Sequence, residues 1–217
     1  MSLANLLMSA PPYDEVLPVV GAAWQGGFYY GRIIIGGVHY ALVVSPRATG
    51  DLTGYVMQND TVYTFAGNTS TNDGKAIQAN MVTHGIAKFP AQQAVMALTI
   101  NGCTDWYIPS KDEMEILYRA LKPHTTQNVT TSGANPSAYP APTSNYLAAN
   151  PTRTTLTDFR STGGTNYLTL DYYYTATQGP GGTEYAHAKR FTTGQDSQDN
   201  IWFDYAVRAI RRVLIPT

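Results

Sequence analysis

The chain of 217 residues carries a formal net charge of -1, and only 13% of its residues are charged, about half the usual share. This composition implies no broad basic face, so it argues against nucleic acid as a partner. The length suits one large domain or a domain with a smaller appendage. The single cysteine, Cys103, excludes an intramolecular disulfide and a multi-cysteine zinc site, and it favours folding in a reducing cytosol.

Tyrosine is unusually frequent, because its 16 residues outnumber the 14 Lys and Arg residues together. A surface poor in charge and rich in Tyr, Thr, Asn and Ser is typical of binding loops, where Tyr gives contact area at a low entropy cost. A β protein that uses its tyrosines for ordinary sheet packing has the same composition. Both interpretations therefore stay open on composition alone.

Residues 1–20 are expected to form an arm. The apolar run near the start predicts a short helical turn, and the following segment, which contains Pro11 and Pro12, predicts extended chain. The arm contains no Lys or Arg, which argues against a signal peptide, and the chain has no apolar run of about 18 residues that would predict a membrane span. We expect the arm to dock on its own domain or on a neighbouring subunit.

Residues 21–70 have the texture of β structure. Two Tyr- and β-branched-rich segments flank Gly36-Gly37 and predict a hairpin with a two-residue turn. A second hairpin is predicted from GYVM and TVYTF, on either side of residues 58–60. The region is either a small β subdomain or the first strands of the main fold.

Three helices are predicted next, over residues 72–83, 89–99 and 110–121. Pro90 suits the first turn of the second helix. The third follows an Asn-Gly turn and a Trp-Tyr-Ile step, and Ser110 with Glu113 has the spacing of a capping box. Its apolar residues at i, i+3, i+4 and i+7 predict one buried stripe. Trp106, just before this helix, is predicted to lie in the core.

Residues 123–167 hold only three charged side chains and predict a long loop that is functional or mobile. Its scattered apolar and aromatic residues indicate that it is pinned to the surface; they are Tyr139, Tyr146, Leu147, Phe159 and Tyr167. The last part predicts three antiparallel strands, over residues 167–178, 184–194 and 200–216.

Alternation along the last strand places Arg208 and Arg212 on one face and Arg211 on the other. We expect these arginines to pair with Asp105 or Glu113 rather than to form an anion site.

The order of these segments resembles a known domain family. The chain has paired helices, GCTDWYIPSKDEMEILY, a long loop, YYYTATQ, AHAKRF and finally YAVRAIRRV. This is similar to the bacterial and phage family typified by the C-terminal domain of collagen-like Lcl proteins, with its GxxDWRLPTxxEL step, YWSST strand and terminal VRxVR. The resemblance covers roughly residues 72–213. It departs from the family at Tyr107, where the family has Arg, and at YYYTAT.

The resemblance implies an α+β, C-type-lectin-like fold, with two helices against antiparallel sheets and long loops. It places this domain at residues 71–217, preceded by the N-terminal arm, 1–20, and the β-hairpin region, 21–70. It also implies a ligand face built by the last strands and their loops. The candidate ligand-binding residues are Tyr172, Tyr173, Tyr174, Glu184, Tyr185, His187, Lys189, Asn200, Trp202, Asp204 and Tyr205. For Trp202, a core position and a ligand-face position are equally compatible with the sequence.

Catalysis is not expected. Formylglycine-generating enzymes share the implied fold but need two cysteines, and Cys103 is interpreted as a small buried hydrophobe. The four histidines stand far apart, and no local triad or carboxylate pair is evident. No cofactor is predicted.

Calcium is the metal to consider, because many C-type lectins use it and because acidic and amide residues gather near the end of the chain. The densest cluster comprises Gln195, Asp196, Asp199, Asn200 and Asp204. None of the EPN, QPD or WND triplets is present. A solvated turn is therefore the preferred interpretation, and no metal site is predicted.

Together these features predict a phage virion protein, made in the host cytoplasm, that forms a tail fibre or receptor-binding appendage. It would recognise a host surface glycan or protein. It would contact other virion proteins and sister subunits through its N-terminal region, with a homotrimer as the oligomer that fibre symmetry suggests. The alternative is a capsid decoration or baseplate protein with no receptor. A bacterial surface adhesin is disfavoured by the expected lack of a signal peptide. No nucleic-acid binding or membrane insertion is predicted.

Overall fold

The computed structural model describes residues 17–59, 65, 67–169 and 172–216, and within them the chain is an α+β protein with antiparallel sheets. The apolar turn expected near the N-terminus and most of the expected TVYTF strand lie outside the described residues. The strands form three sheets. The first contains β1 (Ala23–Trp24), β2 (Gly27–Ile35), β3 (Val38–Val44) and β9 (Ile210–Leu214), and the second contains β4 (Asp51–Leu52) and β8 (Val207–Arg208). The third contains β5 (Tyr172–Gln178), β6 (Tyr185–Arg190) and β7 (Asp196–Asn200).

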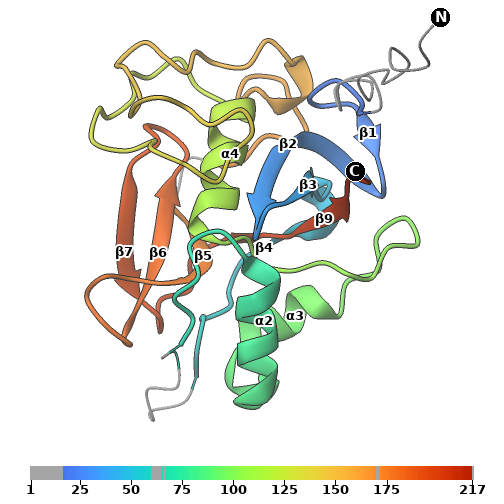
Figure 1. Ribbon diagram of the computed structural model, residues 1–217, viewed down its shortest axis with the longest axis vertical. Coiled ribbons are helices and arrows are strands. Elements are labelled where there is room, and N and C mark those ends of the chain that lie inside the picture. Colours follow the sequence, from blue (N-terminus) through green and yellow to red (C-terminus); the bar gives the residue numbers. More distant parts are fainter. Residues whose placement is uncertain (1–16, 60–64, 66, 170–171, 217) are drawn as a thin grey trace, which may run out of the picture.

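The predicted first hairpin is confirmed. Gly36 and Gly37, at the turn between β2 and β3, both have positive φ, of 57° and 81°, as a two-residue hairpin turn requires. The hairpin shares its sheet with the end of the chain, because β3 pairs with β9 from Tyr40↔Leu214 to Val44↔Ile210. Strands from both sides of the boundary expected at residue 70 therefore lie in one curled sheet (Figure 1).

The second expected hairpin is wrong in its first strand. The GYVM segment is irregular in the structure, and the short strand in this region is β4, which pairs with β8. Met57 and Gln58 instead donate backbone hydrogen bonds to the carbonyl of Ile201, at 2.9 and 3.3 Å. The segment is therefore held by the chain that follows β7 and not by a hairpin partner.

The predicted helices are confirmed, with shorter bounds for the second. Asp73 caps α2 by accepting a hydrogen bond from the Ala76 amide at 2.9 Å, and Pro90 occupies the first turn of α3. The helices and helical turns are α1 (Arg47–Gly50), α2 (Gly74–Thr83), η3 (Ile86–Lys88), α3 (Pro90–Met96), α4 (Lys111–Leu121) and η4 (Thr157–Phe159).

Helix α4 stands between the two larger sheets, with the curled sheet on one side and β5–β6–β7 on the other (Figure 1). Its predicted capping box is present: the Glu113 carboxylate accepts the Ser110 amide and hydroxyl, at 2.7 and 2.8 Å. The expectation of a single buried stripe is wrong, because the carboxylates of Asp112, Glu113 and Glu115 are buried as well. Both sides of the helix are covered, so these acids need internal partners.

A second core lies between α2, α3 and the inner face of β5 and β6 (Figure 1). Trp106 is fully buried in it, as predicted, and donates its indole N–H to the Cys103 carbonyl at 2.9 Å. Cys103 is only half-buried, which corrects its assignment as a buried hydrophobe; its Sγ lies 3.5 Å from the carbonyl of Gln25.

The expected long strand over residues 200–216 does not exist as one element. Asn200 ends β7, a turn follows, and β8 and β9 then join two different sheets. Residues 208–212 therefore do not alternate between the two faces of a single strand. Arg208 is buried with Asp51 (3.3 Å), Arg212 pairs with Asp73 (2.7 Å), and only Arg211 meets the expected Asp105, at 2.6 Å.

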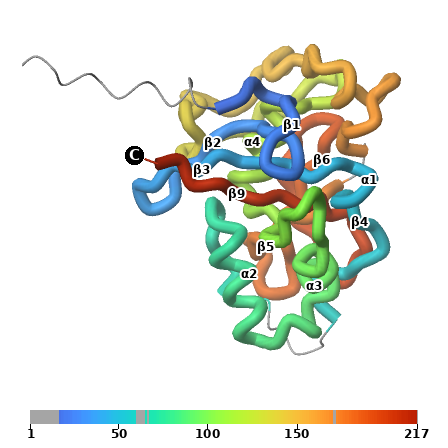
Figure 2. The backbone as a smooth tube through the Cα atoms, turned by 90° about the vertical axis from the view of Figure 1, so that its right-hand side faces the viewer, coloured from blue at the N-terminus to red at the C-terminus, as the bar shows by residue number. Residues whose placement is uncertain are grey.

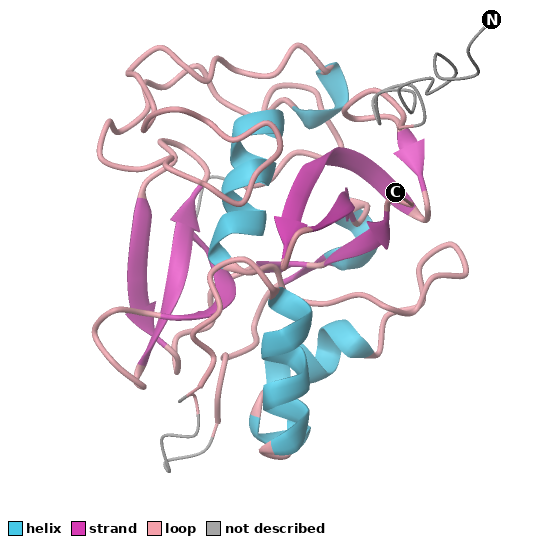
Figure 3. Ribbon diagram, in the orientation of Figure 1, coloured by secondary structure: helices cyan, strands magenta, loops and turns pink. Residues whose placement is uncertain are grey.

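The long connection from α4 to β5 covers one end of the molecule as irregular loops (Figures 2 and 3). Tyr146 and Phe159 are buried and Tyr167 lies under the Arg47 guanidinium at 4.5 Å, so these three residues do pin the loop. Tyr139 and Leu147 are exposed instead. Among the described residues, none of the helices has the length and hydropathy needed to cross a membrane.

Candidate functional site

The predicted ligand face is split by strand alternation. In the ladder of β5 and β6, Tyr173 is opposite Lys189 and Tyr174 is opposite Ala188, so the two pairs lie on different faces of the sheet. Tyr173 belongs to the core around α4, whereas Tyr174 belongs to the core around α2 and α3. A single face that includes three consecutive tyrosines is therefore geometrically impossible.

Three of the predicted ligand residues are buried and cannot contact a ligand directly: Tyr173, Tyr174 and Lys189. The Tyr173 hydroxyl donates to Asp51 Oδ2 at 3.0 Å, and the Tyr174 hydroxyl donates to a backbone carbonyl. Lys189 Nζ donates to Asp196 Oδ1 at 2.7 Å. Burial lowers the pKa of Lys189, and Asp196 opposes that shift. These side chains support the sheet from within.

Tyr185 and His187 follow the same alternation as Lys189 and therefore belong to the face of β6 that is turned toward α4. Both are half-buried, and burial is the main cause that lowers the pKa of His187. They are thus separated by the sheet from the aromatic residues on the other face. The structure does not join them to those residues in one site.

The opposite face carries a cluster that the sequence predicted only in part. The rings of Tyr172 and Tyr205 stack, with centroids 5.8 Å apart and planes inclined by 18°. Phe203 approaches Tyr205 at 6.2 Å and is 51% exposed, and its chain neighbour Trp202 is 37% exposed. We call Tyr172, Trp202, Phe203 and Tyr205 the aromatic patch. Because it is exposed to this extent, Trp202 lies at the surface and not in the core.

Phe203 was missed by the sequence analysis, although a signal was available. It sits in the turn between Asn200 and Tyr205, where two adjacent large aromatic residues, Trp202 and Phe203, cannot both be buried by a short surface turn. The turn is set by Asn200, whose side-chain oxygen accepts the Trp202 amide at 3.0 Å and whose carbonyl accepts the Phe203 amide at 3.0 Å.

Polar groups border the aromatic patch. The Tyr205 hydroxyl donates to Asp199 Oδ2 at 2.5 Å, and this bond is the main reason that the pKa of Tyr205 is raised to about 12. Asp204 is exposed beside it in the chain, and Glu184 accepts the Ile201 amide through its carbonyl at 3.0 Å. Aromatic faces with adjacent carboxylates and amides can bind a sugar or a protein surface.

The acidic cluster considered for calcium is divided between other partners. Asp196 pairs with Lys189 at 2.7 Å and lies 4.0 Å from Lys111, whereas Asp199 holds Tyr205. In the described part of the chain, no three His, Cys, Asp or Glu side chains are grouped closely enough to hold a metal ion.

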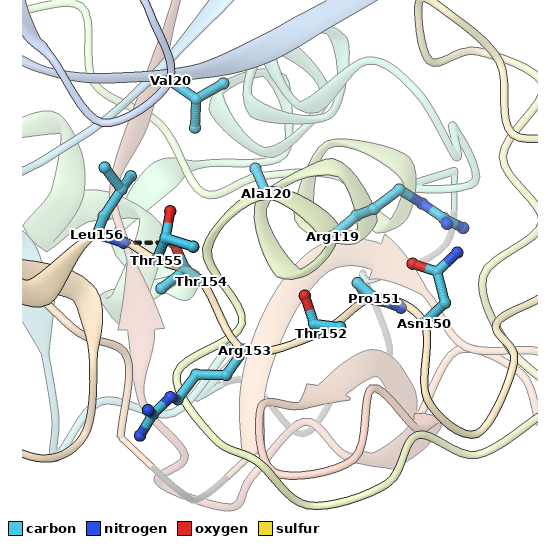
Figure 4. Close-up of a pocket in the computed structure, with 10 residues that line it drawn as sticks. All are labelled: Val20, Arg119, Ala120, Asn150, Pro151, Thr152, Arg153, Thr154, Thr155 and Leu156. Carbon is cyan, nitrogen blue, oxygen red and sulfur yellow. Dashed lines mark hydrogen bonds between the residues drawn. The ribbon is translucent and has the colours of Figure 1, made fainter.

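Four cavities in the described part of the chain are lined by no residue of the aromatic patch. One of about 490 Å³ is bounded by Val20, the end of α4 and residues 150–156 (Figure 4). Its two arginines, Arg119 and Arg153, point away from each other in Figure 4, and Arg119 is already bound to Glu115 at 2.9 Å. This cavity therefore does not focus charge on one point, and its lining offers no convergent catalytic group.

Comparisons with protein-family models, curated proteins and solved structures find no match to this chain.

Proposed function

We propose that this chain is a non-enzymatic phage virion protein with a C-type-lectin-like domain, located on a tail fibre or similar receptor-binding appendage. It recognises a host surface glycan or protein through the aromatic patch. The observation that carries the proposal is the exposure of Trp202 and Phe203 beside the stacked pair Tyr172–Tyr205. Soluble proteins rarely expose a cluster of aromatic side chains. Such a cluster with a polar border therefore often marks an interaction site.

The lectin-like part of the proposal is supported by the arrangement of elements. Two antiparallel sheets enclose α4, α2 and α3 pack under the second sheet, and a long irregular connection precedes β5. Pairing of β3 with β9 brings the beginning and end of the described chain together.

The energetics favour binding by a small number of rings. Truncation of a central aromatic residue in an interface typically costs about 2 kcal/mol or more, because the ring excludes water over a large area. The stack of Tyr205 on Tyr172 and its bond to Asp199 hold these rings before a ligand arrives. Pre-ordered side chains reduce the entropy lost on binding.

The alternative is a capsid decoration or baseplate protein without a receptor. One observation favours it: β9 stands at one end of the strand order β1-β2-β3-β9, and Leu214 on it is exposed. An outer strand with exposed apolar side chains is a suitable surface for contact with other subunits.

Binding of the purified protein to intact candidate host cells separates the two roles. A form lacking residues 1–16 is compared with the full chain, and both are also added to particles depleted of the protein. Saturable cell binding by both forms supports the receptor role. It also places the contact with the host cell outside residues 1–16. Attachment to depleted particles without cell binding by either form supports the alternative.

A further inference from the structure

A separate cavity of about 540 Å³ lies between the α1–β4 segment and the loop that precedes β5. Figure 2 shows α1 and β4 together at one side of the molecule, next to this loop. Its lining includes Arg47 and Asp51 on one side and Thr165 and Thr169 on the other. The cavity has no part in the proposed receptor surface.

Asp51 is the unusual member of this lining. Its side chain is only 7% exposed, and all its described partners act on one oxygen. Oδ2 accepts the Tyr173 hydroxyl at 3.0 Å and Arg208 Nη1 at 3.3 Å. Oδ1 is buried and has no hydrogen-bond partner among the described residues. A buried carboxylate oxygen without a partner is costly, so it indicates a place where a donor from outside the chain belongs.

Arg47 covers this carboxylate without closing a hydrogen bond to it. Its Nε lies 3.7 Å from Asp51 Oδ2, and its guanidinium is stacked over the Tyr167 ring at 4.5 Å. The side chain is 33% exposed. The guanidinium donates no hydrogen bond to any described residue, and both Arg47 and Asp51 line the cavity.

The charges exclude some ligands. Arg47 and Arg208 are balanced by Asp51 and by Asp158, which accepts the Thr165 hydroxyl at 2.6 Å, so the lining has no net charge to attract a metal ion or a free amine. A compact dianion such as phosphate would face the unpaired oxygen of Asp51, which repels it. The arrangement fits a ligand that offers a hydrogen-bond donor and an acceptor side by side. Adjacent hydroxyl groups of a sugar do so, and the Thr165 hydroxyl, which donates to Asp158 at 2.6 Å, keeps a lone pair that can accept from a further one.

We propose that this cavity binds a saccharide, with one hydroxyl donating to Asp51 and the next accepting from Arg47. The Tyr173 hydroxyl, held by the Thr169 amide at 2.9 Å, keeps Asp51 in position from below. Tyr167 provides an aromatic surface beside the guanidinium. The site stands on its own geometry and is independent of the virion role and of the aromatic patch.

Saturation-transfer NMR of the full chain tests the site. The probes are methyl β-galactopyranoside, methyl α-mannopyranoside, glucuronic acid and N-acetylneuraminic acid, each titrated to the millimolar range that single-sugar sites require. At least one is expected to receive saturation from the protein. A response from the neutral glycosides identifies the hydroxyl pair as the recognised group, and a stronger response from the acids identifies a carboxylate on Arg47; both support the site.

Three variants locate the binding. Arg47→Ala is expected to weaken it about tenfold, the equivalent of one charge-assisted hydrogen bond. Ala48→Trp, on the exposed side of the lining, is expected to block it. Arg153→Ala, which removes a half-buried arginine from the cavity of Figure 4, is the matched control and leaves binding unchanged. No response from any sugar, or equal affinity of Arg47→Ala and the parent chain, overturns the proposal.

Discussion

The hydroxyl of Tyr205 and the carboxylate of Asp199 are joined by a hydrogen bond of 2.5 Å that links β7 to the chain returning over the sheet. The bond fixes the Tyr205 ring against Tyr172, and through this stack it determines how the aromatic patch is presented. The order of the patch is thus a property of the fold and precedes any ligand.

This bond predicts a specific alkaline response. The pKa of Tyr205 is about 12, above its unfolded value of about 10, so its stabilising contribution is complete below pH 10 and is lost as the pH rises through 12. The ultraviolet absorbance of the parent chain and of Tyr205→Phe is measured as a function of pH. The difference between the two curves gives the ionisation of Tyr205 alone. Ionisation of Tyr205 near pH 10 in the difference curve contradicts the hydrogen-bonded geometry.

The buried Trp106 and the exposed Trp202 predict opposite outcomes. Trp106→Ala is expected to lower the free energy of unfolding by about 3–5 kcal/mol, because the fully buried ring leaves a cavity. Trp202→Ala, its matched control at a surface position, is expected to change it by less than about 1 kcal/mol. Urea unfolding measures both. Similar losses in the two variants contradict the positions assigned to these side chains.

The Glu113 carboxylate is the polar centre of the core next to α4. It accepts the Tyr107 hydroxyl at 2.6 Å and the Gly74 amide at 3.2 Å, besides the two groups of Ser110. Glu113→Ala leaves these donors buried without an acceptor, so we expect a loss of about 3 kcal/mol or more. Glu113→Gln retains one acceptor and is expected to lose less. Urea unfolding of the two variants provides the comparison, and equal, small losses contradict this network.

Burial of Glu113 is the main cause that raises its pKa above the ordinary value, while the hydrogen bonds from Tyr107 and Ser110 oppose the shift. A raised pKa in the folded state favours the protonated carboxyl. Its contribution to stability is therefore greatest below the unfolded pKa and falls as the pH rises through the folded one.

Asp105 predicts a pH dependence of the opposite sign. Burial raises its pKa, but the hydrogen bond and charge of Arg211, aided by Lys75, outweigh burial and lower it below 3.8. Its contribution is therefore present above about pH 4 and is lost as the pH falls through the folded pKa. Asp105→Asn is expected to be less stable than the parent at pH 6, and this gap is expected to narrow as the pH falls below about 4. Thermal unfolding across this range measures the difference, and a constant gap contradicts the pairing.

Much of the fold could be predicted because its signals are local. The capping box, the proline at the start of α3 and the Gly36-Gly37 turn each act within a few residues. The pairing of β3 with β9 joins segments at opposite ends of the chain, and no local pattern contains it. The division expected at residue 70 therefore did not anticipate that strands from both sides of it share a sheet.

The site was predicted less well because burial depends on what covers each face of the sheet. Alternation alone separates Tyr173 from Tyr172 and Tyr174. It does not reveal that α4 covers one face while the chain after β7 covers part of the other, which buries Tyr174 and leaves Tyr172 and Phe203 at the surface. Lys189 was placed on the ligand face because the resemblance assigns the last strands to that face; in the structure Lys189 is buried and pairs with Asp196.

The central claim is that the aromatic patch binds a host surface molecule. Its most direct test is the dissociation constant of the full chain on intact host cells, compared with a Phe203→Ala/Tyr205→Ala variant. The exposed residue Leu147 provides the control, Leu147→Ala, on a different loop. We predict binding at least about thirtyfold weaker for the double variant, which stays folded although it loses the Tyr205–Asp199 bond, and unchanged binding for the control. Equal affinity of all three proteins contradicts the claim.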